Sequence, residues 1–149
     1  MSHNLQTSLP YLLARAGIRT SQGFSNEIRQ FDLSLNEWRV CATLRHQPSQ
    51  RISEVASHTS IDASTLSRLI DSMIRRELVI RERDAQDARA RALRLTSKGE
   101  ELTDRVIPLA QLYERITLAG IGEDQEKVLK ECLDRIYNNM DMLDKRDRA

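Results

Sequence analysis

The amino-acid sequence predicts a mainly α-helical fold with one small β-hairpin. Of its 149 residues, 30% are charged and only 4% are aromatic, and there are five glycines and three prolines. This composition favours helices over a glycine- and proline-rich β fold. Apolar residues recur at helical spacing along most of the chain, and only residues 78–83 and 91–96 read as strands. A chain of this length is expected to form one compact unit with a substantial core.

Two helices are expected before residue 47. The first covers about 7–30, although its middle, GIRTSQG, is weakly helical and could be a bend. Ser34 and Glu37 then have the spacing of a capping box, in which two backbone N–H groups at a helix start are satisfied reciprocally. The helix that follows carries Trp38 among its apolar residues and ends at the turn HQPSQ.

A short helix and a longer one come next, at about 52–59 and 63–77. The turn TSI separates them, and Asp62 is a good N-cap for the second. This second helix has one continuous apolar stripe, formed by Leu66, Leu69, Ile70, Met73 and Ile74. Its opposite side carries hydroxyl groups and arginines.

Positive charge is concentrated in the middle of the chain. The net charge of the whole chain is +1, yet residues 45–98 hold eleven Lys or Arg against seven Asp or Glu. The two strand-like runs would pair as a hairpin whose polar link, ERDAQDARA, makes a basic tip. This asymmetry indicates an anionic partner for the middle of the chain, with a solvated charged surface as the alternative.

Helices are expected again after the hairpin. Thr96 would cap a long helix, with Glu100 and Glu101 in the first turn where the helix dipole favours acids. Pro108 lies inside this helix and should kink it or leave a local defect. After the break GIGEDQ, a last helix carries apolar residues from Val128 to Leu143.

A short helix, a tight turn, a second helix and a basic hairpin together make a winged helix-turn-helix. The second helix of such a unit fits the DNA major groove, and Arg68 is long enough to offer a bidentate fork to a guanine or a phosphate. The hairpin tip would place Arg89 in the minor groove, with its guanidinium braced by Asp87. An ordinary amphipathic surface helix is the alternative. We therefore predict DNA contacts from Ser64, Thr65, Ser67, Arg68, Arg75, Asp87, Arg89 and Arg91.

The stretch STLSRLIDSMIRRELVIRERDAQDARARALRLTSKG resembles the MarR (multiple antibiotic resistance regulator) family of winged-helix transcription factors. It parallels that family's Ser/Thr-rich recognition helix, LV-x-R strand, D-x-R wing tip and LT-x-x-G helix start. The resemblance implies a homodimeric repressor of a pseudo-palindromic double-stranded DNA operator, released by a small aromatic or anionic effector. It also implies dimerisation helices in residues 1–32 and 99–149, on either side of a DNA-binding region in 33–98.

Two positions depart from the family pattern. Glu77 stands where the family usually has Gly, so we expect the left-handed helix cap to be lost and the turn into the wing to differ. Ala88 stands where a second wing-tip Arg is common, so we expect one minor-groove contact to be missing, with Arg91 as a candidate substitute.

The resemblance further implies an effector pocket between the dimerisation region and the Trp38 helix. The candidate lining residues are Tyr11, Arg15, Arg19, Trp38 and His46. Each also has a structural interpretation, namely core packing for Trp38 and Tyr11, solvated or interface ion pairs for the arginines, and a helix C-terminal contact for His46.

Other classes of function are disfavoured. No Cys or His recurs at metal-ligand spacing, and neither a phosphate-binding Gly loop nor a nucleophile–base pair is apparent, so we predict no metal, cofactor or catalytic residue. Two alternatives stay open, a redox-responsive regulator using Cys41 or Cys132 and a winged-helix interaction module that binds no DNA. Two cysteines make no disulfide framework, and no segment resembles a signal peptide or a membrane span. We therefore expect a cytoplasmic protein without a membrane partner.

Overall fold

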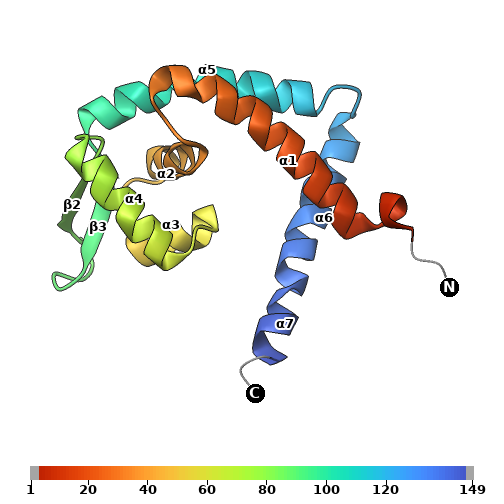
Figure 1. The fold of residues 1–149 in the computed structure, drawn as a ribbon. Helices are drawn as coiled ribbons and strands as arrows, with labels where there is room; N and C mark the ends of the chain where they lie inside the picture. The colour runs from red at the N-terminus through yellow and green to blue at the C-terminus, as the bar shows by residue number, and fades with distance from the viewer. Residues whose placement is uncertain (1–3, 147–149) are drawn as a thin grey trace. The chain divides into compact units, whose positions relative to one another are not determined.

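The predicted fold class is confirmed by the computed structural model, which describes residues 4–146 (Figure 1). The chain is mainly helical and contains one three-stranded antiparallel sheet. It divides into two compact units, one up to Tyr113 and the other from Glu114 onward. The predicted division into dimerisation and DNA-binding segments at residues 32 and 98 stays a prediction.

The N-terminal helices follow the sequence signals closely. Helix α1, Leu9–Ile28, runs through GIRTSQG without a break, and short 3₁₀ turns, Leu5–Thr7 and Arg29–Phe31, flank it. Helix α2, Leu35–His46, starts with the predicted capping box. The Ser34 Oγ accepts a hydrogen bond from the Glu37 backbone N–H at 3.2 Å, and the Ser34 backbone N–H donates to Glu37 Oε2 at 2.8 Å.

The helix-turn-helix consists of α3, Ile52–Thr59, and α4, Ala63–Arg75. Asp62 caps α4 as predicted, because its Oδ1 accepts hydrogen bonds from the Thr65 backbone N–H at 2.9 Å and the Ser64 hydroxyl at 2.8 Å. The Thr65 hydroxyl, followed by the Thr65 backbone N–H and the Ser64 hydroxyl, lowers the pKa of the Asp62 carboxyl to about 2. The predicted stripe of α4 packs into the common core, which includes Ile28, Val40, Leu44, Val55, Leu66, Ile70, Met73, Val79, Leu93 and Val106.

The predicted hairpin is present as β2, Val79–Arg83, and β3, Arg91–Leu95. Val79 pairs with Leu95 at its base, and Arg83 pairs with Arg91 next to its tip. A further strand, β1 (Gln50–Arg51), pairs with β3 on the other side and was not predicted. Two residues are too few to show the alternation that marks a strand in a sequence.

The turn from α4 into β2 corrects one expectation. Glu77 adopts the left-handed conformation, with φ 59°, so the cap is kept although glycine is absent. The backbone N–H groups of Glu77 and Leu78 donate to the carbonyls of Ile74 and Met73, both at 2.9 Å. These bonds satisfy the last carbonyls of α4 in the manner of a Schellman motif and outweigh the preference of Glu for negative φ.

The start of helix α5, Ser97–Thr117, packs against this turn. Thr96 caps it as predicted, and its Oγ1 accepts a hydrogen bond from the Gly99 N–H at 3.0 Å while donating to the Glu77 carbonyl at 2.6 Å. Gly99 is buried against the chain at Leu78, where a Cβ would overlap the Leu78 carbonyl oxygen. The glycine of the LT-x-x-G pattern is therefore required for close backbone packing. Helix α5 continues through Pro108, so the local defect expected there does not end the helix.

The last expected helix is divided into α6, Glu123–Asn139, and α7, Asp141–Arg146. The break before it is confirmed, with Gly120 at φ 82°. The apolar side of α6 and α7 is exposed in the single chain, including Val128, Leu129, Leu133, Tyr137, Met140, Met142 and Leu143.

The close approach at Gly99 gives a first prediction. Gly99→Ala should lower the free energy of unfolding by about 1–3 kcal/mol, because the backbone at Leu78 must move to admit a methyl group. The matched control is Gly17→Ala, since a Cβ added there would meet no described atom within 4 Å beyond its chain neighbours and the backbone of its own helix, and Ala has the higher helix propensity. It should be neutral or stabilising by up to about 1 kcal/mol. Urea unfolding followed by circular dichroism measures both, and a Gly99→Ala protein as stable as the parent would contradict the packing argument.

Candidate nucleic-acid interface

One face of α4 is free of the core. Ser64, Thr65, Ser67, Arg68 and Arg75 are all exposed, whereas Leu66, Ile70 and Met73 on the other side are buried. Within the described residues Arg68 and Arg75 form no ion pair, so their guanidinium groups are available to an anion. The structure thus brings all five α4 candidates to one polar surface.

An ion pair that the sequence did not reveal joins this helix to the hairpin. The Arg81 guanidinium on β2 donates to Asp71 Oδ1 on α4 at 2.7 Å. Both side chains are partly exposed, so the pair contributes little stability on its own. It does link the recognition helix to the base of the wing.

The tip of the hairpin is organised by Asp84, which was also missed. Its Oδ2 accepts a hydrogen bond from Arg51 Nε at 2.7 Å, and its Oδ1 accepts from the backbone N–H groups of Gln86 at 2.7 Å and Asp87 at 3.1 Å. Arg51 and these backbone donors lower the pKa of the Asp84 carboxyl to about 2. Asp84 therefore fixes the start of the tip and ties it to β1.

Asp87 acts differently from the prediction. Its Oδ1 accepts from the backbone N–H of Arg89 at 3.0 Å, and its carbonyl accepts from Ala90 N–H at 3.0 Å. Among the described residues no ion pair joins Asp87 to the Arg89 guanidinium, so the expected brace is wrong. A short carboxylate reaches the amide two residues on, as in an Asx turn. Asp87 thus shapes the loop, and the side chain of Arg89 is exposed.

The end of the hairpin carries like charges in register. Arg83 and Arg91 are direct cross-strand partners, and both are exposed. Like charges directly opposite one another destabilise a strand pair, whereas an anion between them removes the penalty. Arg83 belongs to the candidate surface, although no motif in the sequence singles it out. With Arg89 and Arg91 it forms the cluster that we call the wing cations.

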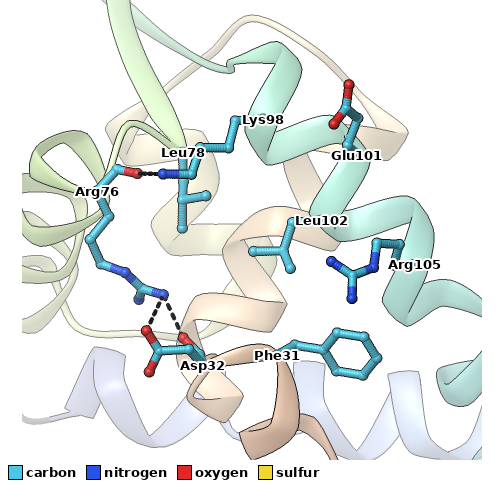
Figure 2. Close-up of a pocket in the computed structure, with 8 residues that line it drawn as sticks. All are labelled: Phe31, Asp32, Arg76, Leu78, Lys98, Glu101, Leu102 and Arg105. Carbon is cyan, nitrogen blue, oxygen red and sulfur yellow. Dashed lines mark hydrogen bonds and ion pairs between the residues drawn. The ribbon is translucent and has the colours of Figure 1, made fainter.

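The five candidate effector residues line none of three cavities found among the described residues. Arg15, Arg19 and His46 are exposed, and Tyr11 is half-buried on α1. Trp38 packs against the core, with its ring 5.7 Å from that of Phe24, which supports its structural interpretation. Two cavities meet at Asp32 and Arg76, one on the side of α5 (Figure 2) and the other between the end of α1 and the start of α2, and both are lined by other residues. This pocket stays a prediction.

The cysteines differ in environment. Burial raises the pKa of the Cys41 thiol to about 11, so little reactive thiolate forms at neutral pH. Cys132 is exposed on α6. No group of three or more His, Cys, Asp and Glu within the described residues could hold a metal ion. In the same part of the chain, no helix is both long and apolar enough to cross a membrane.

Known proteins with a similar sequence and fold identify the family to which this geometry belongs. The MarR family model matches residues 33–90, the helix-turn-helix and most of the hairpin. A MarR family transcriptional regulator from Silicibacter pomeroyi DSS-3 has a solved structure that is 30% identical in sequence, with a TM-score of 0.78 over 91% of this chain and 99% of that one.

The chain belongs to the MarR family.

Its relatives are transcriptional regulators. The transcriptional repressor IacR of Pseudomonas putida is 27% identical over 134 residues, which cover 89% of this chain and 80% of that protein. MepR of S. aureus, solved as a complex with DNA, has the same fold at a TM-score of 0.81 and 20% identity, covering 91% of this chain and 98% of MepR. For this MarR-family chain, the winged helix-turn-helix predicted from the sequence is therefore confirmed.

The lowered pKa of Asp84 gives a prediction with a definite sign. Folding stabilises the ionised carboxylate, so its contribution is complete above the unfolded pKa of roughly 3.9 and is lost as the pH falls towards the folded value of about 2. Asp84→Asn removes this dependence. As the pH is lowered from roughly 3.9 to about 2, the melting temperature should therefore fall less steeply for Asp84→Asn than for the parent.

The exposed Asp134 on α6 supplies the matched control. Asp134→Asn should keep the parent slope. Equal slopes for the parent and Asp84→Asn would show that the Asp84 network contributes nothing to folding.

Proposed function

We propose that this chain is a homodimeric repressor that binds a pseudo-palindromic double-stranded DNA operator. The observation that carries the proposal is the exposure of cationic and hydroxyl side chains on α4 and the hairpin, with the unfavourable Arg83–Arg91 pairing near the hairpin tip. Two arginines that face each other across a strand pair repel one another. The pair is therefore stabilised when DNA phosphates lie against both side chains.

Each element is suited to one groove. The major groove admits one α-helix, and the short hydroxyl side chains of Ser64, Thr65 and Ser67 let α4 approach the base edges. Arg68 reads a base or a phosphate, and Arg75 contacts the DNA backbone. The wing cations enter or flank the minor groove, where a narrow groove strengthens the negative potential. MepR, a protein of the same fold, was solved in complex with DNA, which supports DNA as the partner of this surface.

The exposed apolar residues support a dimer. Leu133 is 41% exposed and Tyr137 is 61% exposed in the single chain, on a helix that has no buried residue of its own. Helix α1 exposes Leu9, Leu12 and Ile18 as well. Exposed apolar surface of this extent marks an interaction site. We assign residues 1–32 and 99–149 to dimerisation and 33–98 to DNA reading, so that two recognition helices meet two half-sites.

The repressor is released by a small aromatic or anionic effector in this proposal. An effector acts only through its higher affinity for the arrangement that cannot bind DNA. Residues Tyr11, Arg15, Arg19, Trp38 and His46 are one candidate site, as the family resemblance implies.

Two other functions make different predictions. A winged-helix interaction module would show no salt-dependent binding to duplex DNA, and the exposed wing cations argue against it. A redox-responsive regulator needs a reactive thiol, and the raised pKa of Cys41 argues against that residue.

Substitutions on the two elements should have different effects on DNA binding. Arg89→Ala should weaken binding to operator and random duplexes alike, and should flatten the salt dependence by up to about 0.9 log unit per lost phosphate contact in each subunit. Arg68→Ala should cost about 1–3 kcal/mol on the operator and less on random DNA, because a base contact carries sequence information. Asp87→Ala should behave as a milder Arg89→Ala, since it loosens the loop that presents Arg89.

Mobility shifts at several salt concentrations measure these effects on both duplexes. Arg39→Ala is the matched control, because Arg39 is an exposed arginine on α2 outside the proposed surface. If Arg89→Ala binds both duplexes as the parent does, the wing is not a DNA contact.

Dimerisation through α6 gives a separate test. Leu133→Glu should shift the protein towards monomer and weaken operator binding, because it places a charge in the proposed apolar interface. Asn138→Glu adds the same charge at an exposed polar position of the helix and should leave the dimer intact. Analytical ultracentrifugation reports the assembly state, and a Leu133→Glu protein that sediments as the parent does would overturn the assigned interface.

A further inference from the structure

We propose that the side chains in the first turn of the recognition helix present only hydrogen-bond acceptors to DNA and select a base that carries an amino group in the major groove. That base is adenine or cytosine. The inference rests on the proposed binding of duplex DNA and adds a determinant of sequence preference to it. The residues concerned are Asp62, Ser64 and Thr65 at the start of α4, which we call the acceptor set.

The hydroxyl hydrogen of Ser64 is taken up by Asp62. The Ser64 Oγ lies 2.8 Å from Asp62 Oδ1. An ionised carboxylate can only accept hydrogen bonds, so the hydroxyl must be the donor in this one. The Ser64 oxygen then has only lone pairs left for a further partner, and the residue is exposed. Towards DNA, Ser64 is therefore an acceptor.

The Thr65 hydroxyl is engaged by the same carboxylate. It makes the largest contribution to the lowered pKa of Asp62, ahead of the Thr65 backbone N–H and the Ser64 hydroxyl. With a pKa of about 2, the Asp62 carboxyl is ionised at neutral pH, which keeps both hydroxyls in the donor role towards it. The Thr65 N–H donates to Oδ1 at 2.9 Å and fixes the carboxylate at the helix start. Asp62 thus sets the direction of both hydroxyl groups.

The charge of Asp62 makes a phosphate contact at this end of α4 unfavourable. A helix N-terminus ordinarily attracts anions through its free N–H groups and its dipole. Here an exposed carboxylate already occupies that position, and it repels a second anion. The amino groups of bases meet no such repulsion. The acceptor set is therefore suited to base edges rather than to the DNA backbone.

The place of the acceptor set decides which groups it meets. Recognition helices of the helix-turn-helix class contact base edges with their N-terminal residues. In the major groove, cytosine N4 and adenine N6 are donors, whereas guanine O6 and thymine O4 are acceptors. Two acceptors that face each other leave both without a partner, which is unfavourable once water is excluded. Guanine and thymine are therefore disfavoured at the contacted position.

Arg68 has the opposite chemistry on the same face of the helix. It follows Ser64 by four residues and Thr65 by three, so the three side chains are neighbours on the helix surface. A guanidinium can only donate, and its most common base partner is guanine. We therefore expect an amino-bearing base and a guanine close together in each half-site.

Selection of bound duplexes from a random library by the full-length protein measures the preference. For the parent, one position of each half-site should favour adenine or cytosine over guanine and thymine by roughly fivefold or more. Asp62→Ser keeps an N-cap but has neither the carboxylate nor its charge, so the hydroxyls of Ser64 and Thr65 regain the freedom to donate. The preference at that position should then fall to about twofold or less, while other positions keep theirs.

Asp62→Asn separates hydrogen bonding from charge. Its amide oxygen still accepts from the Thr65 N–H and the two hydroxyls, so the base preference should be kept. Both Asp62 variants should bind random duplexes at least as tightly as the parent, because a negative charge near the phosphates is removed. Weaker binding to every duplex would instead indicate a purely structural role and would overturn the inference.

The matched control is Ser57→Ala, which removes an exposed hydroxyl on α3 outside the proposed surface. It should change neither the base preference nor the affinity for random duplexes. Circular dichroism melting confirms that each variant is folded.

Base analogues test the amino group itself. In the selected duplex, purine in place of adenine, or pyrimidin-2-one in place of cytosine, removes that group. The replacement should weaken binding by the parent roughly threefold or more. It should have little effect on a Ser64→Ala, Thr65→Val double variant, which has lost both hydroxyl acceptors. Equal weakening of the two proteins would show that the amino group is not read by these side chains.

The outcomes distinguish this inference from the proposed function. A protein that binds no duplex refutes the proposed repressor function and the inference together. A protein that selects a sequence, but with the same preferences in the parent and in folded Asp62→Ser, refutes the inference alone. The same holds if the position that changes in Asp62→Ser is guanine or thymine in the parent selection.

Discussion

The DNA-reading lobe depends on the close contact between the start of α5 and the turn that joins α4 to β2. Gly99 lies against the backbone of Leu78, and Thr96 connects the two segments through its hydroxyl and its N–H, which donates to the Leu78 carbonyl at 3.0 Å. This contact sets where β2 leaves the helix and where β3 returns. The recognition helix and the wing can meet neighbouring grooves of one duplex only if that geometry is fixed.

Local sequence signals predicted most of the elements. The capping box at Ser34, the N-cap at Asp62 and the apolar stripe of α4 involve residues at most a few positions apart, and their physical basis is contained in the segment itself. The polar face of α4 and the exposure of Arg89 and Arg91 follow from the same periodicities. Function at the level of the family followed from the resemblance of residues 64–99 to the motifs of the MarR family.

What the sequence did not reveal depends on distant partners. Arg51 meets Asp84, 33 positions away, and Arg76 meets Glu37, 39 positions away. Strand register brings Arg83 opposite Arg91, and no single segment contains that information. The loss of the left-handed cap at Glu77 was wrongly predicted, because hydrogen bonds around the turn override the preference of a non-glycine residue for negative φ. The role of Asp87 was mispredicted because its carboxylate accepts a hydrogen bond from the backbone amide of Arg89, two residues on.

Acidic residues in the basic surface have an organising role. Asp62, Asp71 and Asp84 orient the helix start, the wing base and the wing tip through short hydrogen bonds. They lower the total positive charge of the surface, and so they weaken its attraction for any polyanion. In return they fix the positions of the remaining cations before DNA arrives, which reduces the ordering cost of binding. This arrangement favours selective binding of DNA over a high affinity for any polyanion.

The left-handed Glu77 has a consequence for motion on slow timescales. A non-glycine residue in this conformation costs about 1–2 kcal/mol, and at φ 59° Glu77 lies between the recognition helix and the wing. Opening this turn releases that strain, so its amides should exchange their hydrogens through a local opening well below the free energy of global unfolding.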